Sequence, residues 1–323
     1  MLRKINKVVS CFKSLYTSVN LMFAIRACFC IVYDSITKHE EMKYINLLRG
    51  YVKQEYEARI IELSIKTEKH YLPKIDFGMK IPVWICWFQG EESMPALVRC
   101  CYKNLKNKIP SNSEIVLITK ENYLDYMDIP LGIINKVECG VFSFTNFSDL
   151  IRCKLLATYG GMWIDSTVYV GYPIQKELLD ADFYSQKTDT LFFKKRFVTE
   201  SRWASWLMVC NTKVGLFQLV GTILEEYMIN SNAMIDYYLI DYIIELMYET
   251  IPSIRQCIDE VDVNNVDAFE LVNILNEPYD DKRLSSFLGE HQFNKLSNSF
   301  PFINQMCSGT LTNYYKFIVE NSR

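Results

Sequence analysis

Three charged residues in one short stretch of the sequence have the types and spacing to bind a metal ion or a phosphate. Asp149 and Arg152 lie three residues apart in an apolar segment, so they share one face if that segment is a helix. Gly160 and Gly161 follow, and Asp165 then ends a short apolar run. Because burying an unpaired carboxylate is costly, Asp165 needs a partner, and a metal ion bound to a diphosphate would be one.

The elements that would position these residues can be predicted from the local pattern. We expect a helix that starts at Thr145 or Ser148, whose hydroxyls can cap it, with Asp149 in its first turn where the helix dipole favours negative charge. The two glycines end the helix. Residues 162–164 form a buried strand, and Asp165 lies at its carboxyl end, where α/β sheets bind ligands.

Simpler interpretations of the same residues exist. Asp149 and Arg152 would also be an ordinary ion pair on a helix surface, worth about 0.3–0.5 kcal/mol. Asp165 would also be a turn residue that bonds the backbone of Ser166 or Thr167. The residue spacing, the two glycines and the position of Asp165 at a strand end all agree. This agreement favours a ligand site over the two simpler interpretations together.

This stretch resembles the signature of sugar-transfer enzymes in glycosyltransferase family 32, and most closely the bacterial capsular polysaccharide synthesis branch. The family pattern is S-D-x-x-R, an apolar helix, and then G-G-x-[WY]-x-D-x-[DT]. The residues in those places are Ser148, Asp149, Arg152, Gly160, Gly161, Trp163, Asp165 and Thr167. The resemblance covers residues 79–300, including the apolar segment 81–90 expected to be the first strand.

The resemblance implies an α/β fold of the GT-A type, a nucleotide-sugar-binding, Rossmann-like mixed sheet flanked by helices. It implies that Asp165, Asp149 and Arg152 are the catalytic residues, with Asp165 meeting the metal and the sugar nucleotide. Trp87 matches an aromatic residue that stacks on the nucleobase. The full set implied to bind the donor is Trp87, Gln89, Asp149, Arg152, Gly161, Ser166, Asp241, Lys295 and Ser297.

The resemblance also implies a divalent cofactor, Mn²⁺ or Mg²⁺, held by Asp165 and Thr167. The second aspartate of the D-x-D motif is replaced here by Thr167. A neutral hydroxyl is a poorer ligand for these ions than a carboxylate, so the substitution weakens the expected metal site.

The implied function is a glycosyltransferase that moves a hexose from a nucleotide diphosphate sugar, with UDP favoured, to a growing capsular or lipopolysaccharide-type glycan. The acceptor would be a glycan or a lipid-linked glycan, and transfer would retain the configuration of the anomeric carbon. Two alternatives stay open. The chain would be a nucleotide-sugar-binding protein that has lost catalysis, as Thr167 suggests, or a transferase that modifies proteins.

Three segments after residue 200 carry further expectations, and the first two of them have two interpretations each. Asp241 lies in an apolar helix expected at 233–248, where it either faces a cleft or is exposed or bonded to a tyrosine hydroxyl. The segment 203–206 with its two tryptophans shapes an acceptor pocket or packs in the core. Asn294, Lys295 and Ser297 would close over the diphosphate as a mobile lid that excludes water.

Composition sets the domain organisation and excludes some partners. The chain has 323 residues, of which 50% are hydrophobic, and a net charge of −3, which does not suggest a nucleic-acid-binding protein. We expect a helical N-terminal extension at 1–78, with a linker at 71–78, followed by a GT-A domain at 79–323.

The start of the chain is basic and apolar. Residues 20–33 are too short an apolar run to cross a bilayer, and no signal-peptide cleavage site follows, so we expect a cytoplasmic protein. Five basic residues precede the first acid, Asp34: Arg3, Lys4, Lys7, Lys13 and Arg26. This segment is either an amphipathic helix at the inner face of the cytoplasmic membrane or a helix packed on the catalytic domain.

Overall fold

The computed structural model describes residues 2–37, 42–67, 80–190, 196–210 and 215–322. The first half contains α1 (Leu2–Ser18), α2 (Leu21–Thr37), α3 (Lys43–Thr67), β1 (Ile81–Cys86), α4 (Ala96–Lys106), β2 (Ser113–Ile118), α5 (Leu131–Glu138) and α6 (Phe144–Thr158). Then follow β3 (Gly161–Ile164), β4 (Val168–Val170), α7 (Lys176–Leu179), β5 (Phe183–Ser185), β6 (Leu207–Cys210), α9 (Leu216–Asn230) and α10 (Leu239–Thr250). The last elements are α11 (Pro252–Asp259), α12 (Leu271–Leu275), α13 (Asp281–Glu290), β7 (Phe293–Lys295), a π-helical turn (Tyr314–Val319) and α14 (Glu320–Ser322).

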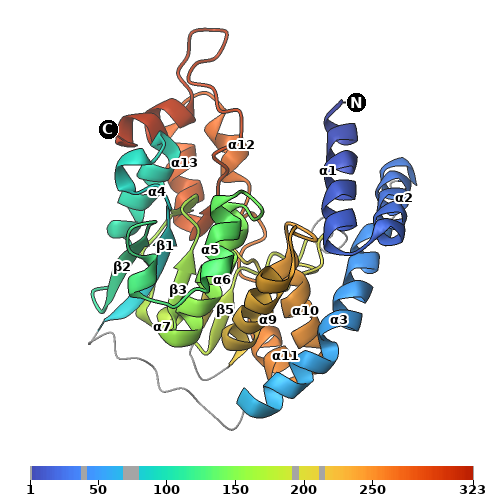
Figure 1. Cartoon of the computed structure of the whole chain (residues 1–323). Coiled ribbons are helices and arrows are strands. Elements are labelled where there is room, and N and C mark those ends of the chain that lie inside the picture. Colours follow the sequence, from blue (N-terminus) through green and yellow to red (C-terminus); the bar gives the residue numbers. More distant parts are fainter. Residues whose placement is uncertain (1, 38–41, 68–79, 191–195, 211–214, 323) are drawn as a thin grey trace.

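A five-stranded mixed sheet organises the fold, with the strand order β2-β1-β3-β6-β5. Strand β1 is parallel to β2 and β3, whereas β6 is antiparallel to β3 and β5. A separate two-stranded sheet pairs β4 with β7. Helices flank the main sheet (Figure 1), which confirms the predicted α/β class with a mixed sheet and helices at the N-terminal end.

Alternating side chains along the strands bury two separate apolar cores, one on each face of the sheet. Trp84, Trp163 and Met208 point into a core shared with helices α6, α9 and α10. Their strand neighbours, such as Val83 and Met162, point into a second core shared with α4, α12 and α13. Apolar residues on both faces are typical of a sheet that is covered by helices on both sides.

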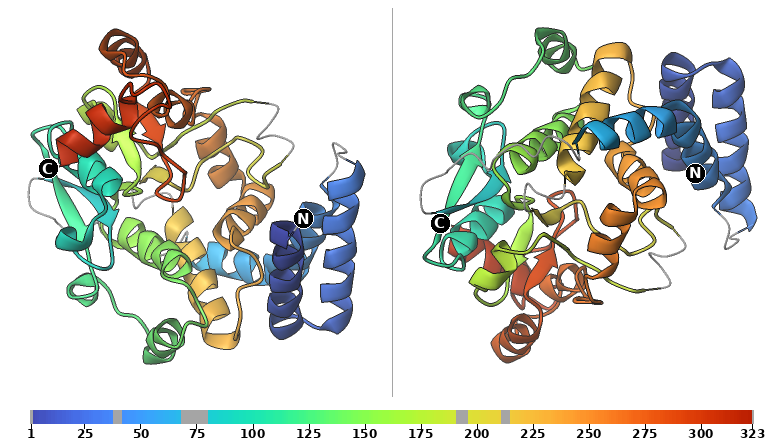
Figure 2. Two further views of the ribbon diagram at one scale, coloured as in Figure 1. Left: turned by 90° about the horizontal axis from the view of Figure 1, so that it is seen from above. Right: turned by 90° about the horizontal axis from the view of Figure 1, so that it is seen from below.

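The N-terminal helices pack on the first of these cores. Leu48 of α3 is fully buried in it, and α3 lies beside α9 and α10 (Figure 1). The contact also contains an ion pair of Arg59 with Glu226 and a hydrogen bond of 2.9 Å from the Tyr44 hydroxyl to Asp236. Helices α1 and α2 stand at the outer edge of the molecule (Figure 2). The predicted linker at 71–78 lies outside the described residues, and no described helix is long and apolar enough to cross a membrane.

Two predicted helix starts are wrong. Helix α6 begins at Phe144, because the Ser143 hydroxyl accepts the backbone N–H of Asn146 at 3.1 Å and so caps it. The hydroxyl of Ser148 instead donates to the Thr145 carbonyl within the helix, and Asp149 lies beyond the first turn.

The helix expected from residue 233 begins at Leu239. The segment before it is held outside a helix by side chains. The Tyr227 hydroxyl accepts the N–H of Ile235, and the Asp236 carboxylate accepts the N–H of Tyr238.

The two glycines after α6 allow the chain to turn tightly from helix to strand. Gly160 and Gly161 have φ angles of 68° and 87°, in the left-handed region that side chains disfavour. A Cβ atom on Gly161 would also lie only 2.2 Å from the carbonyl oxygen of Pro82 in β1. The neighbouring strand therefore approaches closely only because residue 161 has no side chain, and this brings Asp165 to the end of the sheet.

We expect Gly161→Ala to lower the free energy of unfolding by about 3 kcal/mol or more, because the added methyl group meets backbone atoms and the φ angle is strained. The matched control is Gly132→Ala in α5, where an added Cβ has no neighbour within 4 Å. That change should raise stability by about 0.5–1 kcal/mol, since alanine favours a helix over glycine. Urea unfolding of both variants measures the difference, and equal effects would contradict the close-approach argument.

Candidate active site

A cavity of about 740 Å³ lies where β1 and β3 end, within the size range of small-molecule sites. Its walls come from the segments that follow β1, β3 and β5, from the start of α6, and from α10 and β7. Nine residues predicted for the site line it: Trp87, Gln89, Asp149, Arg152, Asp165, Ser166, Thr167, Asp241 and Lys295. Parts of the chain that are far apart in sequence thus meet in one place.

The Asp165 carboxylate accepts three donors from three different elements. Its Oδ1 atom lies 3.0 Å from Trp163 Nε1 and 3.3 Å from Arg152 Nη2, and its Oδ2 atom lies 2.6 Å from Lys295 Nζ. Burial alone would raise the pKa of Asp165, but the charges of Lys295 and Arg152 outweigh it and hold this pKa below its usual value. Asp165 is therefore an ionised anchor, and the interpretation of it as a mere turn residue is wrong.

Arg152 is buried between two carboxylates. Its Nη1 atom lies 3.2 Å from Asp149, and the two side chains are only 5% and 9% exposed, so the surface-ion-pair interpretation is wrong. The guanidinium also lies over the Trp163 ring, with its central carbon 4.8 Å from the ring centre. Among the described residues, the buried Nε has no hydrogen-bond acceptor, whereas Nη1 faces Asp149.

Two further carboxyl groups near Arg152 are buried and hard to ionise. Burial raises the pKa of Asp149 to about 7, although the charge of Arg152 opposes the shift. Burial likewise raises the pKa of Asp241 to about 6, against the hydrogen bond from Trp203 and the charge of Arg152. Near neutral pH Asp165 is therefore ionised, Asp149 is in the middle of its titration, and Asp241 is mostly ionised but gains a proton at slightly lower pH.

Lys295 does not belong to a mobile loop, so the predicted lid is wrong for Asn294 and Lys295. Both lie in β7, which pairs with β4, and Asn294 is fully buried. The next residue continues this pairing, because the N–H of Leu296 bonds the Thr167 carbonyl at 2.9 Å. The Lys295 ammonium reaches Asp165 and also donates to Thr167 Oγ1 at 2.9 Å.

The predicted Mn²⁺ or Mg²⁺ site at Asp165 and Thr167 does not fit the donors present. Lys295 Nζ already bridges the two side chains, and Arg152 adds a second cation on the other carboxylate oxygen. Within the described part of the chain, no three His, Cys, Asp or Glu residues are grouped so as to hold a metal ion. These ions prefer several oxygen ligands, which this arrangement does not offer. The metal expectation stays a prediction that the geometry does not favour.

Asp241 and the tryptophan segment before β6 both face the cavity. Asp241 is 4% exposed and accepts a hydrogen bond of 2.9 Å from Trp203 Nε1, so it is neither exposed nor bonded to a tyrosine. Trp203 and Trp206 line the cavity and are also buried in the cores, which combines the two interpretations of that segment.

The sequence analysis missed several residues that line the cavity, and it assigned to the site two residues that do not line it. The missed lining residues include Phe144, Gln186, Thr188, Phe197, Tyr237 and Tyr238. They come from segments without a charged motif, so the sequence pattern held no signal for them. Gly161 and Ser297, predicted to bind the donor, do not line the cavity. Gly161 acts through the turn before β3, and Ser297 bonds Ser299 near the surface.

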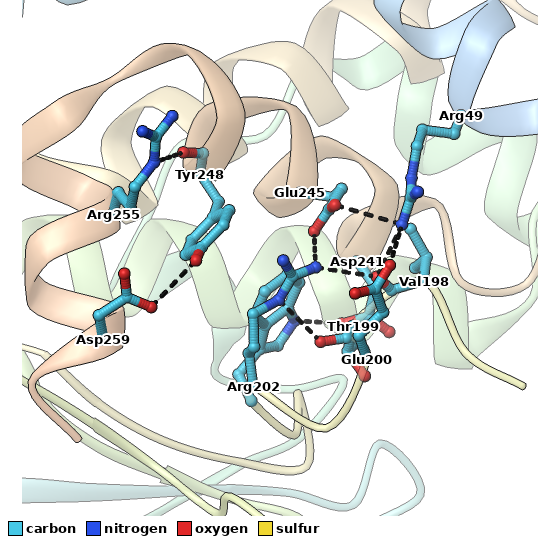
Figure 3. Close-up of polar contacts among 11 residues, drawn as sticks. Arg49, Val198, Thr199, Glu200, Arg202, Asp241, Glu245, Tyr248, Arg255 and Asp259 are labelled. Atoms are coloured by element: carbon cyan, nitrogen blue, oxygen red, sulfur yellow. Dashed lines mark hydrogen bonds and ion pairs between the residues drawn. The ribbon is translucent and has the colours of Figure 1, made fainter. Parts of the chain in front are cut away.

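A partly buried ion cluster braces the wall at residues 198–202 (Figure 3). Glu245 of α10 is paired with Arg202 of the wall and with Arg49 of α3, the latter at 3.2 Å. Arg49 also reaches Glu200 at 2.9 Å. Because a buried carboxylate without partners is costly, Glu245 fixes both arginines and so ties helix α3 to the cavity wall.

The raised pKa of Asp149 predicts a pH-dependent stability. Between its ordinary value of 3.8 and about 7, the folded chain retains a proton that the unfolded chain has lost, so this group makes stability fall as pH rises. The charged groups that set this pKa are Arg152, Asp241 and Asp165.

The Asp149→Asn variant lacks this titrating group. The difference between its free energy of unfolding and that of the unaltered chain should therefore shift in favour of the variant by about 2–3 kcal/mol between about pH 5 and pH 8. Urea unfolding at several pH values measures this, with the exposed Asp128→Asn as the control. Parallel curves for Asp149→Asn and the unaltered chain would show that Asp149 ionises normally.

The comparisons with known proteins agree with the sequence signature. The family model described as capsular polysaccharide synthesis protein matches residues 30–318, which is most of the chain. Neither the curated proteins nor the solved structures include a match. The matched region contains every lining residue of the cavity. The chain therefore belongs to the capsular polysaccharide synthesis protein family.

Proposed function

We propose that this chain is a glycosyltransferase that moves a hexose from a nucleotide diphosphate sugar, with UDP favoured, to a growing capsular or lipopolysaccharide-type glycan. The observation that carries the proposal is the pair of cations, Arg152 and Lys295, held on either side of one carboxylate in the cavity. Membership of a capsule-synthesis family supports a biosynthetic role of this kind.

The cations suit a diphosphate leaving group. In the transfer, the bond between the anomeric carbon and the β-phosphate oxygen breaks, and its electron pair leaves with the nucleoside diphosphate. A hydroxyl oxygen of the acceptor bonds to the anomeric carbon, and its proton passes to the departing phosphate, on the same face when configuration is retained. Arg152 and Lys295 would stabilise the charge that develops on the phosphate, since fixed donors lower such a barrier most.

Other residues of the cavity fit the remaining parts of a sugar nucleotide. Trp87 and Gln89, which follow β1, would meet the base, and aromatic rings stack well on bases. Asp149 and Asp241 would accept hydrogen bonds from sugar hydroxyls, with Ser166 beside them. Nucleotide sugars are made in the cytoplasm, so we place the reaction there, on a glycan or lipid-linked glycan acceptor.

A catalytically inactive nucleotide-sugar-binding protein is the alternative from another class. The observation in its favour is Thr167, which offers no carboxylate beside Asp165. A protein acceptor is a further alternative within the enzymes, and no feature of the described residues favours it over a glycan.

Mass spectrometry of released nucleotide tests the proposal. The protein is incubated with UDP-, GDP- and CMP-sugars, the last having a monophosphate as leaving group. We expect release from one diphosphate donor and a loss of about 100-fold in Asp165→Asn, because the neutral amide no longer holds the two cations in place. The exposed control Asp128→Asn should be unaffected.

Two outcomes would count against the proposal. Equal release by Asp165→Asn and Asp128→Asn would show that the cavity is not the reaction site. Nucleotide binding with no release, in the presence of extracts that contain glycan acceptors, would favour the inactive binding protein.

A further inference from the structure

We propose that the ammonium group of Lys295 binds the donor diphosphate in the position that the D-x-D resemblance assigns to a divalent metal ion, so that binding requires no metal. The inference rests on the proposed function and names the group that neutralises the leaving diphosphate. It concerns the residues of this chain and departs from the metal dependence implied by the resemblance.

The first argument is the position of the ammonium. Lys295 Nζ lies 2.6 Å from Asp165 Oδ2 and 2.9 Å from Thr167 Oγ1, the two side chains implied to hold the metal. A lysine ammonium has three donors, and these two contacts leave the third available. Its side chain is 20% exposed and lines the cavity, so that donor can reach a ligand.

The second argument is the charge balance. A divalent ion placed here would lie beside Arg152 and Lys295, two fixed cations, and Asp165 is the one carboxylate among the described residues that contacts both. Thr167 adds no charge where an aspartate would. Both oxygens of the Asp165 carboxylate therefore already face a cation without a metal, which disfavours a third cation at this place.

The third argument is rigidity. Lys295 is held from both sides, because its own N–H bonds the Ala268 carbonyl at 2.7 Å while β7 pairs with β4. Strand β4 is fixed in turn by Asn104, whose side chain accepts the N–H of Val170 at 2.9 Å. A cation fixed in advance stabilises developing charge without rearrangement, which is the property that a bound metal ion would otherwise supply.

Binding of UDP and of inorganic pyrophosphate, followed by tryptophan fluorescence, tests this inference. Four tryptophans line the cavity and report on binding: Trp87, Trp163, Trp203 and Trp206. We expect the Kd of UDP to be the same within about twofold in EDTA, in Mg²⁺ and in Mn²⁺, since Lys295 supplies the positive charge that the diphosphate needs.

Lys295→Met should weaken UDP binding by about 30-fold, through the loss of a charge-assisted hydrogen bond. Lys295→Arg should recover part of the lost affinity for UDP, since arginine keeps the positive charge. Lys282→Met, an exposed lysine of α13, is the matched control and should bind as the unaltered chain does. Melting temperatures of all variants establish that they are folded.

The outcomes separate this inference from the proposed function. Binding that appears only with Mn²⁺ or Mg²⁺, or that is unchanged in a folded Lys295→Met, would overturn the role of Lys295 and leave the transferase proposal standing. No binding of UDP, GDP or pyrophosphate under any condition would overturn both.

An independent observation concerns the outer face of α2, and from it we infer that α1 and α2 dock on an anionic membrane surface. Met22, Phe29 and Ile36 recur every seven residues, so they share one side of the helix. They are 66%, 72% and 75% exposed, whereas Ala24 and Ala27 on the other side are fully buried. Figure 2 shows α2 at the outer edge of the molecule, with this helix pair away from the sheet.

Charge decides which partner fits this face. Residues 1–33 contain five basic residues and no acidic one, whereas the whole chain has a net charge of −3. An exposed apolar stripe in a part of the sequence whose charges are mostly basic matches the boundary of a bilayer that contains anionic lipids. A second copy of the same segment would bring like charges together, so self-association fits less well.

Sedimentation with phosphatidylglycerol-containing vesicles tests this docking. We expect binding that exceeds binding to phosphatidylcholine vesicles, that weakens in salt, and that falls about tenfold in the double variant Phe29→Ser, Ile36→Ser. The control is Leu131→Ser, Ile303→Ser, which alters two exposed apolar residues elsewhere. Unchanged binding in the α2 variant, no vesicle binding at all, or a dimer that the α2 variant dissociates would each overturn the inference.

Discussion

The carboxylate of Asp165 is the interaction on which the site depends, because it joins side chains from three different elements. Trp163 from β3, Arg152 from α6 and Lys295 from β7 all donate to it. Without this anion the two cations would repel each other in a partly buried pocket. The strong pairing also explains why the pKa of Asp165 is depressed while the more deeply buried Asp149 and Asp241 have raised pKa values.

The arrangement places two cations beside the two oxygens of the Asp165 carboxylate. Arg152 is itself buried against Asp149, Asp165 and the Trp163 ring, and these partners offset the cost of burying its charge.

The parts of the site that follow from local pattern could be predicted, and those that depend on distant pairing could not. Residues 148–167 form one continuous helix, turn and strand, so their spacing alone places Asp149, Arg152 and Asp165 together. The position of Lys295 depends on β7, a strand of three residues too short for an alternation signal, which pairs with β4 far back in the chain. The cap of α6 was misplaced because three hydroxyl residues lie within six positions, and only backbone geometry selects Ser143.

Helix α3 supports one wall of the cavity from outside. Residues 197–206 form one wall with little regular structure, and Glu200 and Ser201 have left-handed φ angles of 47° and 70°. Such a segment cannot hold its shape by backbone pairing, so it requires side-chain contacts. Arg49 of α3 supplies them through Glu200 and Glu245. The family match begins inside α2 and includes all of α3, which is what we expect if the helix that braces the wall is part of the conserved architecture of the fold and not an independent addition.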